Sequence, residues 1–293
     1  MKHSIHSDIL TVVINEKGAE LNSIKSNKSQ KEYLWQGNPD VWDQQAPILF
    51  PIVGRLKDGK YTYDGKSYKL PIHGFAADSL FTTDGADENG NSIIFTLKSS
   101  TETLKIYPFD FIFRVIFKLN QNTLETTYQV ENKSDGPMYF SCGSHEGYNV
   151  PWNQGESFDD YYLEFEKDAD YQSLLVSENG LLLDSTFEVV KGWHLPLSYE
   201  LFKDNDSLAF AKVPSSRVTL GSNKNSTKII VDYKNTPNLV LWTRQNAAYL
   251  CIEPWDGLPD YEATDGDFSK KPGNVCLQKG ETYNMTHSII IEE

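Results

Sequence analysis

The 293-residue sequence has few cysteines, few arginines and no long apolar run, and each shortage argues against a class of protein. The three cysteines, Cys142, Cys251 and Cys276, are an odd number without paired spacing. This argues against a disulfide scaffold and predicts reduced thiols that pack as small buried side chains. No segment approaches the roughly 18 uncharged residues that a membrane span requires, and the N-terminus lacks a basic patch followed by an apolar run. The sequence therefore predicts a soluble protein of the cytoplasm.

Basic residues are in the minority, with 27 lysines and arginines against 41 aspartates and glutamates and a formal net charge of −14. A charge of this sign repels nucleic acid and anionic membrane surfaces at long range, so neither is a predicted partner. A neutral small molecule, or one whose charge is paired locally, suits the chain better. The sequence leaves the oligomeric state open.

The common signatures of metal, nucleotide and hydrolase sites are missing. The histidines are scattered, and His145-Glu146 is not followed by the second histidine of a zinc-protease helix. Asp265-Gly266-Asp267 lacks the regularly spaced ligands of a calcium loop. No glycine-rich phosphate loop precedes a helix, and no Gly-x-Ser-x-Gly elbow occurs. We therefore expect no metal ion, no nucleotide and no other cofactor.

Apolar and aromatic residues, by contrast, are plentiful and alternate as in β-strands. The composition is 39% hydrophobic and 13% aromatic, which is enough for a sizeable core. Every second residue from Phe111 to Leu119 is apolar, while Arg114 and Lys118 lie on the other face. The pattern repeats over residues 123–132, and the Asn-Gln-Asn between the two runs is typical of a turn. These two runs predict a β-hairpin.

Further strands, separated by turn signals, are expected at residues 92–99, 207–213, 228–233, 238–243, 248–253 and 287–293. Asp-Gly pairs within residues 63–66 and 83–85 mark additional hairpins. We find no long amphipathic helix, linker, low-complexity tract or fixed-period repeat. The chain is therefore predicted to be all-β, with residues 1–293 forming a single domain of two large antiparallel sheets packed face to face. The pattern leaves a barrel as an alternative.

Polar residues that could carry chemistry concentrate in four segments, residues 50–61, 70–78, 140–151 and 251–260. Glu253 ends an apolar run and precedes Pro254, so a carboxylate stands at the end of a predicted buried strand. The alternative is a glutamate turned to solvent. Trp255 offers a ring that can stack on the C–H face of a sugar or, alternatively, pack in the core.

Two histidines and an arginine in these segments are further candidates. His145 lies in Gly-Ser-His-Glu-Gly, where small neighbours let its side chain line a cleft, and His73 lies in Pro-Ile-His-Gly-Phe. For each of them a structural or surface histidine is an equal alternative. Arg55 is one of only four arginines and follows Gly54. Its planar five-donor fork suits sugar hydroxyls, whereas the alternative is a surface ion pair.

Taken together and in this order, the motifs resemble those of the aldose 1-epimerase (galactose mutarotase-like) family, and most of all its bacterial LacX-type branch. The most specific stretch is Cys251-Ile252-Glu253-Pro254-Trp255-x-Gly. It is supported upstream by Gly54-Arg55-Leu56, Leu70-Pro71-x-His73-Gly74-Phe75-Ala76 and Gly143-x-His145. The resemblance runs over nearly the whole chain. It implies a large antiparallel β super-sandwich with a cleft that binds a hexose without metal or nucleotide.

The resemblance also implies roles for individual residues. Glu253 matches the family's general base and His145 its general acid, while Arg55 and His73 match positions that bind or orient the sugar. Asp206, in Asp-Ser-Leu-Ala-Phe, resembles a sugar-contacting acid in a looser match.

In the implied reaction, the base removes the proton of the C1 hydroxyl and the acid protonates the ring oxygen, which opens the ring. Rotation about C1–C2 and closure by the same pair give the other anomer. We therefore predict an isomerase of carbohydrate metabolism that acts on an aldohexose such as galactose or glucose. The alternatives are a hexose 6-phosphate mutarotase, which needs cations such as Arg55 and Lys57 at the cleft, and a non-catalytic carbohydrate-binding or sensing protein. Glu146, if it lies close, is expected to raise the pKa of His145.

Two stretches depart from the family pattern, and one match has no assigned role. LacX-type sequences often have an arginine after His-Gly-Phe-Ala, whereas this chain has Ala77 and then Asp78, which removes a cation that could contact an anionic sugar. After His145, residues 146–148 (Glu-Gly-Tyr) replace the usual small residue or proline and phenylalanine. We expect this second departure to reshape the pocket. Lys271 resembles a recurring lysine whose role the resemblance leaves open.

Overall fold

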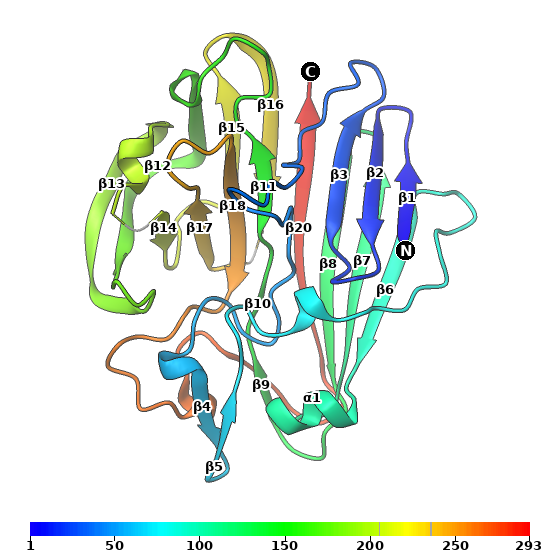
Figure 1. The fold of residues 1–293 in the computed structure, drawn as a ribbon, viewed down its shortest axis with the longest axis vertical. Coiled ribbons are helices and arrows are strands. Elements are labelled where there is room, and N and C mark those ends of the chain that lie inside the picture. The colour runs from blue at the N-terminus through cyan, green and yellow to red at the C-terminus, as the bar shows by residue number, and fades with distance from the viewer. Residues whose placement is uncertain (205, 235) are drawn as a thin grey trace.

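The computed structural model describes residues 1–204, 206–234 and 236–293, and β-strands dominate it (Figure 1). The strands of the first half are β1 (Lys2–His6), β2 (Leu10–Asn15), β3 (Leu21–Ser26), β4 (Lys60–Tyr63), β5 (Lys66–Lys69), β6 (Ser92–Lys98), β7 (Phe111–Asn120), β8 (Thr123–Asn132), β9 (Met138–Phe140), β10 (Cys142–Gly143) and β11 (Glu146–Asn149). Those of the second half are β12 (Tyr161–Val176), β13 (Leu182–Pro196), β14 (Ser207–Phe210), β15 (Arg217–Ser222), β16 (Asn225–Asp232), β17 (Asn238–Trp242), β18 (Tyr249–Asp256), β19 (Val275–Leu277) and β20 (Thr282–Glu292). The helical elements are α1 (Thr101–Ile106) and the 3-10 turns η1 (Lys57–Gly59), η2 (Ala76–Asp78), η3 (Phe158–Asp160), η4 (Tyr199–Phe202) and η5 (Phe268–Lys270).

Within these residues, thirteen strands form one large antiparallel sheet in the order β10-β18-β17-β14-β12-β15-β16-β20-β8-β7-β6, with β11 beside β18 and β13 beside β12. Strands β1–β3 form a separate sheet that lies in front of β6–β8 in Figure 1. The two layers are in contact, because the rings of His3 on β1 and Phe95 on β6 are 5.8 Å apart. The prediction of an all-β fold of large antiparallel sheets is confirmed.

The hairpin predicted over residues 111–132 is present as β7 and β8. Asn120 pairs with Thr123, so Gln121 and Asn122 form the turn, and Gln121 takes a positive φ of 52°. The predicted turn within residues 63–66 joins β4 to β5. The hairpin predicted at residues 83–85 is wrong: Thr82 and Ala86 both bridge to β6, so this segment runs along the edge of that strand.

The strands β1–β3, β9–β13, β15 and β19 were not predicted. In β12 the buried alternation of Tyr161, Leu163 and Phe165 gives way to exposed charged residues, and the pairing with β13 shifts register between Glu164 and Ala169. Most of β13 is exposed or half-buried, so no apolar alternation marks it. Irregular and exposed pairing of this kind leaves little signal in the sequence.

The strand that organises the site is β18, which is buried on both faces. Leu250 and Ile252 point into the main apolar core, whereas Tyr249 and Cys251 belong to a separate cluster on the other face. Both β10 and β11 pair with β18 along one edge, and β17 pairs along the other. Residues of β10, β11 and β17 therefore lie beside those of β18 on its second face.

Helices contribute little to the described ranges. The helix α1 has six residues, which agrees with the predicted lack of a long amphipathic helix. No helix in these ranges combines the length and hydrophobicity needed to cross a membrane. The cysteines are free thiols, and Cys142 and Cys251 are buried as predicted. The predicted burial is wrong for Cys276, which is exposed on β19 because its neighbour Leu277 takes the inward position.

Candidate active site

A buried ion pair stabilises the loop that carries Arg55. Asp260 and Lys271 are 3% and 6% exposed, and Lys271 Nζ lies 2.9 Å from Asp260 Oδ1. The Asp260 backbone N–H donates to the Arg55 carbonyl at 2.8 Å, and Asp260 Oδ2 accepts from the Lys57 N–H at 2.9 Å. Burial lowers the pKa of Lys271, and Asp260 opposes this shift. The pair thus sets the backbone path from Arg55 to Lys57, which gives Lys271 a structural role.

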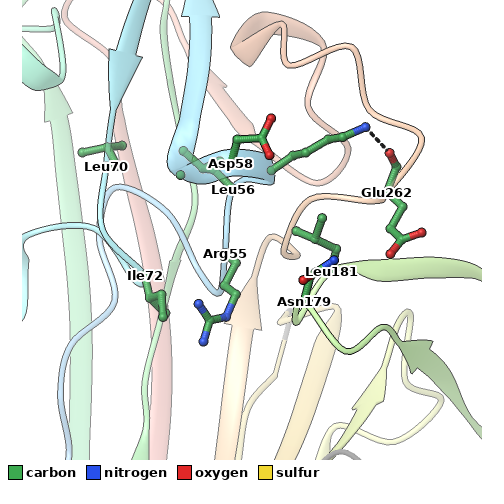
Figure 2. A pocket seen from close by; sticks show the side chains of 10 residues that line it. Arg55, Leu56, Asp58, Leu70, Ile72, Asn179, Leu181 and Glu262 are labelled. Carbon is green, nitrogen blue, oxygen red and sulfur yellow. Dashed lines mark hydrogen bonds between the residues drawn. The ribbon is translucent and has the colours of Figure 1, made fainter.

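The Arg55 side chain is exposed at the edge of a cavity of about 500 Å³, and it lies between Ile72 and Asn179 in the view of Figure 2. Gly180, at the tip of the β12–β13 hairpin, lets this approach happen. Its φ is +74°, and a Cβ there would lie 2.7 Å from both Cδ and Nε of Arg55. The guanidinium is therefore held over the hairpin tip.

His73 is the third residue of a turn in which the Gly74 N–H donates to the Pro71 carbonyl at 3.0 Å. Its φ of +64° is a conformation that residues other than glycine rarely adopt. The Gly54 N–H donates to His73 Nδ1 at 3.0 Å, which puts the proton of the neutral ring on Nε2. Burial, and then the charge of Arg55, lowers the pKa of His73 to about 4. His73 is therefore a neutral ring at pH 7 with a fixed Nε2–H donor.

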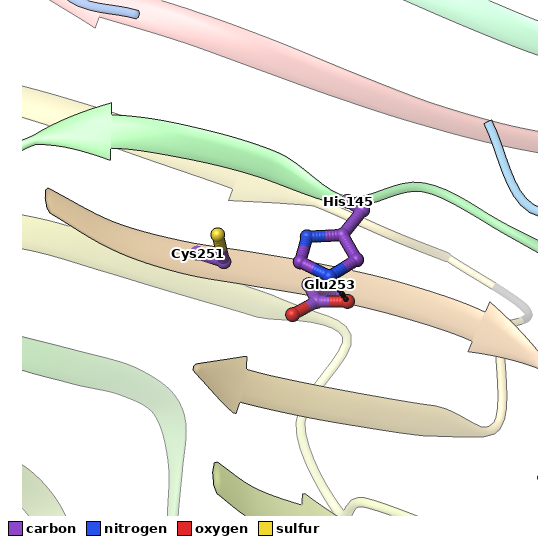
Figure 3. A group of neighbouring side chains, drawn as sticks. All are labelled: His145, Cys251 and Glu253. Atoms are coloured by element: carbon purple, nitrogen blue, oxygen red, sulfur yellow. Dashed lines mark ion pairs between the residues drawn. The ribbon is translucent and has the colours of Figure 1, made fainter. Parts of the chain in front are cut away.

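His145 and Glu253 meet across two strands. The register of β10 and of β11 against β18 is the same on either side of the break between them. His145, which lies in that break, is therefore directly across from Glu253 on β18. His145 Nε2 is 3.5 Å from Glu253 Oε2 (Figure 3). The His73 ring meets the His145 ring edge-on at 5.4 Å, so the fold brings together residues of three predicted site segments.

This acid–histidine pair is buried. The side chains of His145 and Glu253 are 10% and 1% exposed, so Glu253 is not turned to solvent. Among the described residues, neither Glu253 oxygen has a hydrogen-bond partner of normal geometry. Burial, with a smaller contribution from Glu146, raises the pKa of Glu253 well above its usual range. Burial, and then His73, lowers the pKa of His145 well below its usual range. The two shifts favour the uncharged form of each group, a protonated carboxyl beside a neutral imidazole.

A side-chain hydrogen bond holds Trp255 beside this pair, in place of a backbone hydrogen bond that cannot form between the two strands. Pro254 has no N–H to give to the Ser144 carbonyl opposite it. The Trp255 indole N–H donates to that carbonyl instead, at 3.0 Å. The ring is 5% exposed in an apolar cluster, and its centroid lies 5.9 Å from that of His73. Trp255 therefore serves both of the roles considered from the sequence, since it packs in a core and borders the site.

Two tryptophans that the sequence analysis did not single out contact His145. The ring centroids of Trp42 and Trp242 lie 5.2 and 5.4 Å from that of His145. With Tyr249 they form an aromatic wall beside the pair. Trp42 comes this close because residue 147 is glycine, where a Cβ would lie 2.7 Å from the tryptophan Cζ3. The position of Trp242 on a strand next to β18 could have indicated it, whereas Trp42 lies in a loop with no such signal.

Asp206 lies next to the aromatic wall, just before β14. The following residue pairs with Trp242 on β17, and the Asp206 carbonyl accepts from the Thr243 N–H at 3.0 Å. Partial burial raises the pKa of the Asp206 carboxyl, and the charge of Arg244 opposes this shift. Asp206 in turn contributes to the raised pKa of Tyr249.

Glu146 lies on the opposite side of the sheet from His145, although the two are neighbours in the sequence. Successive residues of a strand face opposite sides of the sheet, and Glu146 Oε1 lies 2.9 Å from His287 Nε2 on β20. The expectation that Glu146 raises the pKa of His145 is wrong. Tyr148 also faces the main core. The side chains of residues 146 and 148 therefore lie behind the sheet, whereas Gly147 between them faces the site and lets Trp42 approach His145.

His145, Cys251 and Glu253 form a group that could hold a metal ion, since their ligand atoms all lie within 4.8 Å of one another (Figure 3). Cys251 shares a face of β18 with Glu253 because the two are two positions apart in the strand. A thiolate, an imidazole and a carboxylate together suit a divalent ion such as Zn²⁺. Such an ion would occupy the atoms that an acid–base pair uses. The absence of a metal ion stays a prediction.

Comparison with known proteins relates the whole chain to one family. A family model described as aldose 1-epimerase matches residues 1–289. The chain is 35% identical to the chromosomal Protein LacX of Lactococcus lactis subsp. lactis over 302 aligned positions, which cover 99% of both chains. The plasmid Protein LacX of the same organism is also 35% identical, over 304 positions.

Solved structures agree with this relation. A galactose mutarotase related enzyme from Lactobacillus acidophilus has a TM-score of 0.94 and 36% identity, covering 100% of this chain and 98% of its own. A galactose mutarotase-like protein from Lactobacillus casei ATCC 334 has a TM-score of 0.93 and 29% identity, covering 100% of both chains. The resemblance inferred from the motifs is confirmed.

Proposed function

The chain belongs to the aldose 1-epimerase family and is an isomerase of that type, and from this premise we propose that it interconverts the α and β anomers of an aldohexose such as galactose or glucose. The observation that carries the proposal is the distance of 3.5 Å between Glu253 Oε2 and His145 Nε2. The C1 hydroxyl and the ring oxygen of a pyranose are bonded to the same carbon. A carboxyl and an imidazole this close can therefore reach both oxygens at once.

In the proposed reaction, Glu253 accepts the proton of the C1 hydroxyl while His145 donates a proton to the ring oxygen. The bond between C1 and the ring oxygen breaks as a carbonyl forms at C1, which gives the open-chain aldehyde. After rotation about C1–C2, the freed hydroxyl adds back to the other carbonyl face, returning its proton to His145 as Glu253 returns its proton to O1. Only protons move between the sugar and two side chains, so we propose no cofactor for the reaction.

The shared proton must change place before this reaction can start. In the resting pair the raised pKa of Glu253 and the lowered pKa of His145 favour the proton on the carboxyl. A C1 hydroxyl that donates to Glu253 favours the carboxylate, and a ring oxygen that accepts from Nε2 favours the imidazolium. We propose that sugar binding transfers the proton from Glu253 to His145, so that base and acid form only around a bound substrate.

Sugar binding is assigned to Arg55, His73, Asp206 and Trp255. The guanidinium of Arg55 and the fixed Nε2–H of His73 are donors for hydroxyl oxygens. The Asp206 carboxyl supplies an acceptor beside the aromatic wall, and the Trp255 ring supplies an apolar face.

We further propose that residues 1–293 act as one domain, because the large sheet draws strands from residue 92 to residue 292. Location in the cytoplasm stays a prediction.

The direct test is polarimetry of freshly dissolved α-galactose and α-glucose with and without the purified protein. We expect the rotation to reach its equilibrium value faster in proportion to the protein concentration. The buffer should contain EDTA, because a metal ion held by His145, Cys251 and Glu253 would block the pair. A rotation time course that the protein leaves unchanged for both sugars would contradict the proposal.

The pH dependence of kcat/KM should report the single shared proton. Because the pKa of His145 is lowered, a second proton is taken up only well below pH 6.5, and the base is then lost. Because the pKa of Glu253 is raised, the last proton leaves only well above pH 4.5, and the acid is then lost. We expect a bell-shaped profile whose acid limb lies below pH 6.5, measured by polarimetry with the uncatalysed rate subtracted at each pH. An acid limb at or above pH 6.5 would contradict this assignment.

A further inference from the structure

The cavity beside Arg55 shares this residue with the proposed active site. Its volume of about 500 Å³ is typical of small-molecule sites. Arg55 and Ile72 line it, and their chain neighbours Gly54 and His73 are joined by two hydrogen bonds, at 2.9 Å to the Gly54 carbonyl and at 3.0 Å to His73 Nδ1. The His73 ring contacts His145, so the edge of the cavity at Arg55 and Ile72 lies near the acid–base pair.

The opposite wall of the cavity is the tip of the β12–β13 hairpin, which is held in place. Asn179 and Leu181 line the cavity there, with Asn179 near Arg55 in Figure 2. The Leu182 N–H donates to the Asp260 carbonyl at 2.9 Å, and the Glu262 N–H donates to the Leu182 carbonyl at 3.0 Å. Asp260 is the partner of Lys271, so the buried ion pair supports this wall as well as the Arg55 loop. Because these bonds form the wall before a ligand binds, little of the binding free energy is lost in ordering it.

The charges that line the cavity balance. Arg55 and Lys57 line it together with Asp58 and Glu262, and Lys57 Nζ donates to the Glu262 carbonyl at 2.5 Å. A phosphate group requires converging cations, which this arrangement does not supply. Ala77 stands where relatives often have an arginine, and its neighbour Asp78 pairs with Lys17 at 2.9 Å on the surface. The cavity is therefore suited to an uncharged group.

The remaining lining matches the two kinds of surface on a sugar ring. Ile72 is 43% exposed and, with Leu181, offers aliphatic contact to C–H faces. The Arg55 guanidinium and the Asn179 amide are planar groups that hydrogen-bond to hydroxyls. We infer that the cavity binds a glycosyl group attached to the substrate, so that the preferred substrate is a reducing disaccharide. The inference rests on the proposed function, with the reducing aldohexose at Glu253 and His145.

The test compares α-lactose with α-glucose by polarimetry, because the two differ only by the 4-O-glycosyl group on the reducing glucose. We expect kcat/KM for α-lactose to exceed that for α-glucose about tenfold, which is the gain from roughly one net hydrogen bond. The variant Asn179→Trp fills the cavity and should remove this preference while leaving kcat/KM for α-glucose unchanged. Its matched control is Glu178→Trp, at the exposed neighbouring position of the same turn, which should leave both values unchanged. Urea midpoints of the variants monitor folding.

Each other outcome overturns a defined part of the inference. If α-glucose is turned over but α-lactose has no advantage, or keeps one in Asn179→Trp, the cavity does not bind a glycosyl group. If glucose 6-phosphate has the highest kcat/KM of the three, the cavity binds a phosphate and the inference is wrong. If neither these three sugars nor α-galactose is turned over, the proposed function itself fails.

Discussion

Replacing Glu253 by glutamine is expected to lower kcat for α-galactose by about 10²–10⁴-fold, the usual contribution of one general acid–base group. Glutamine has nearly the same shape as the protonated carboxyl but cannot accept the C1 hydroxyl proton or hold the shared proton. The free energy of unfolding should change little, because burial raises the pKa of Glu253 and so favours a neutral carboxyl in the resting enzyme. Polarimetry measures kcat, and calorimetry of galactose binding should still detect the sugar.

Two comparisons separate loss of the base from a general defect. Glu200→Gln, at an exposed side chain, should retain full turnover. His145→Asn should lose about as much as Glu253→Gln, and the double variant should lose little more, because the two groups act in one step. Near-normal turnover in Glu253→Gln would show that another group is the base. Additive losses in the double variant would show that the two residues do not act together.

Replacing Lys271 by methionine is expected to lower the free energy of unfolding by about 3–5 kcal/mol, the usual cost of removing one partner of a buried ion pair. Asp260 is 3% exposed, so its carboxylate would be left charged and buried without the 2.9 Å contact to Nζ. The Leu258 carbonyl would also lose the donor that it now has at 2.6 Å. Urea denaturation followed by tryptophan fluorescence measures the change.

The matched control is Lys270→Met, because Lys270 is the exposed neighbour and its ion pair with Asp267 is on the surface. We expect its urea midpoint to match that of the unmodified protein. Adding Asp260→Asn to Lys271→Met should recover part of the loss, because the amide oxygen can still accept from the Lys57 N–H without a buried charge. Equal urea midpoints for Lys271→Met and Lys270→Met would contradict a stabilising role for the buried pair. KM should rise in Lys271→Met if the pair positions Arg55.

Local chemistry in the sequence was enough to predict the fold class and the candidate site residues. The hairpin of β7 and β8 follows from apolar residues at every second position, a pattern that depends only on the pleat of a single strand. Glu253 stands out because a carboxylate within a buried run requires a reason, and the run is contiguous. The family resemblance depends on short contiguous motifs of the same kind, and the match over residues 1–289 agrees with it.

Only the tertiary structure decided which of these residues meet, and in which protonation state. His145 faces Glu253, and Glu146 faces His287, because strand register assigns alternate residues to opposite faces, and register is set by pairing between distant segments. The opposite pKa shifts of Glu253 and His145 come from burial, which sums over side chains from the whole fold. For the same reason, the Asp260–Lys271 pair and the cavity beside Arg55 have no local signal: each is made by segments that are adjacent only after folding.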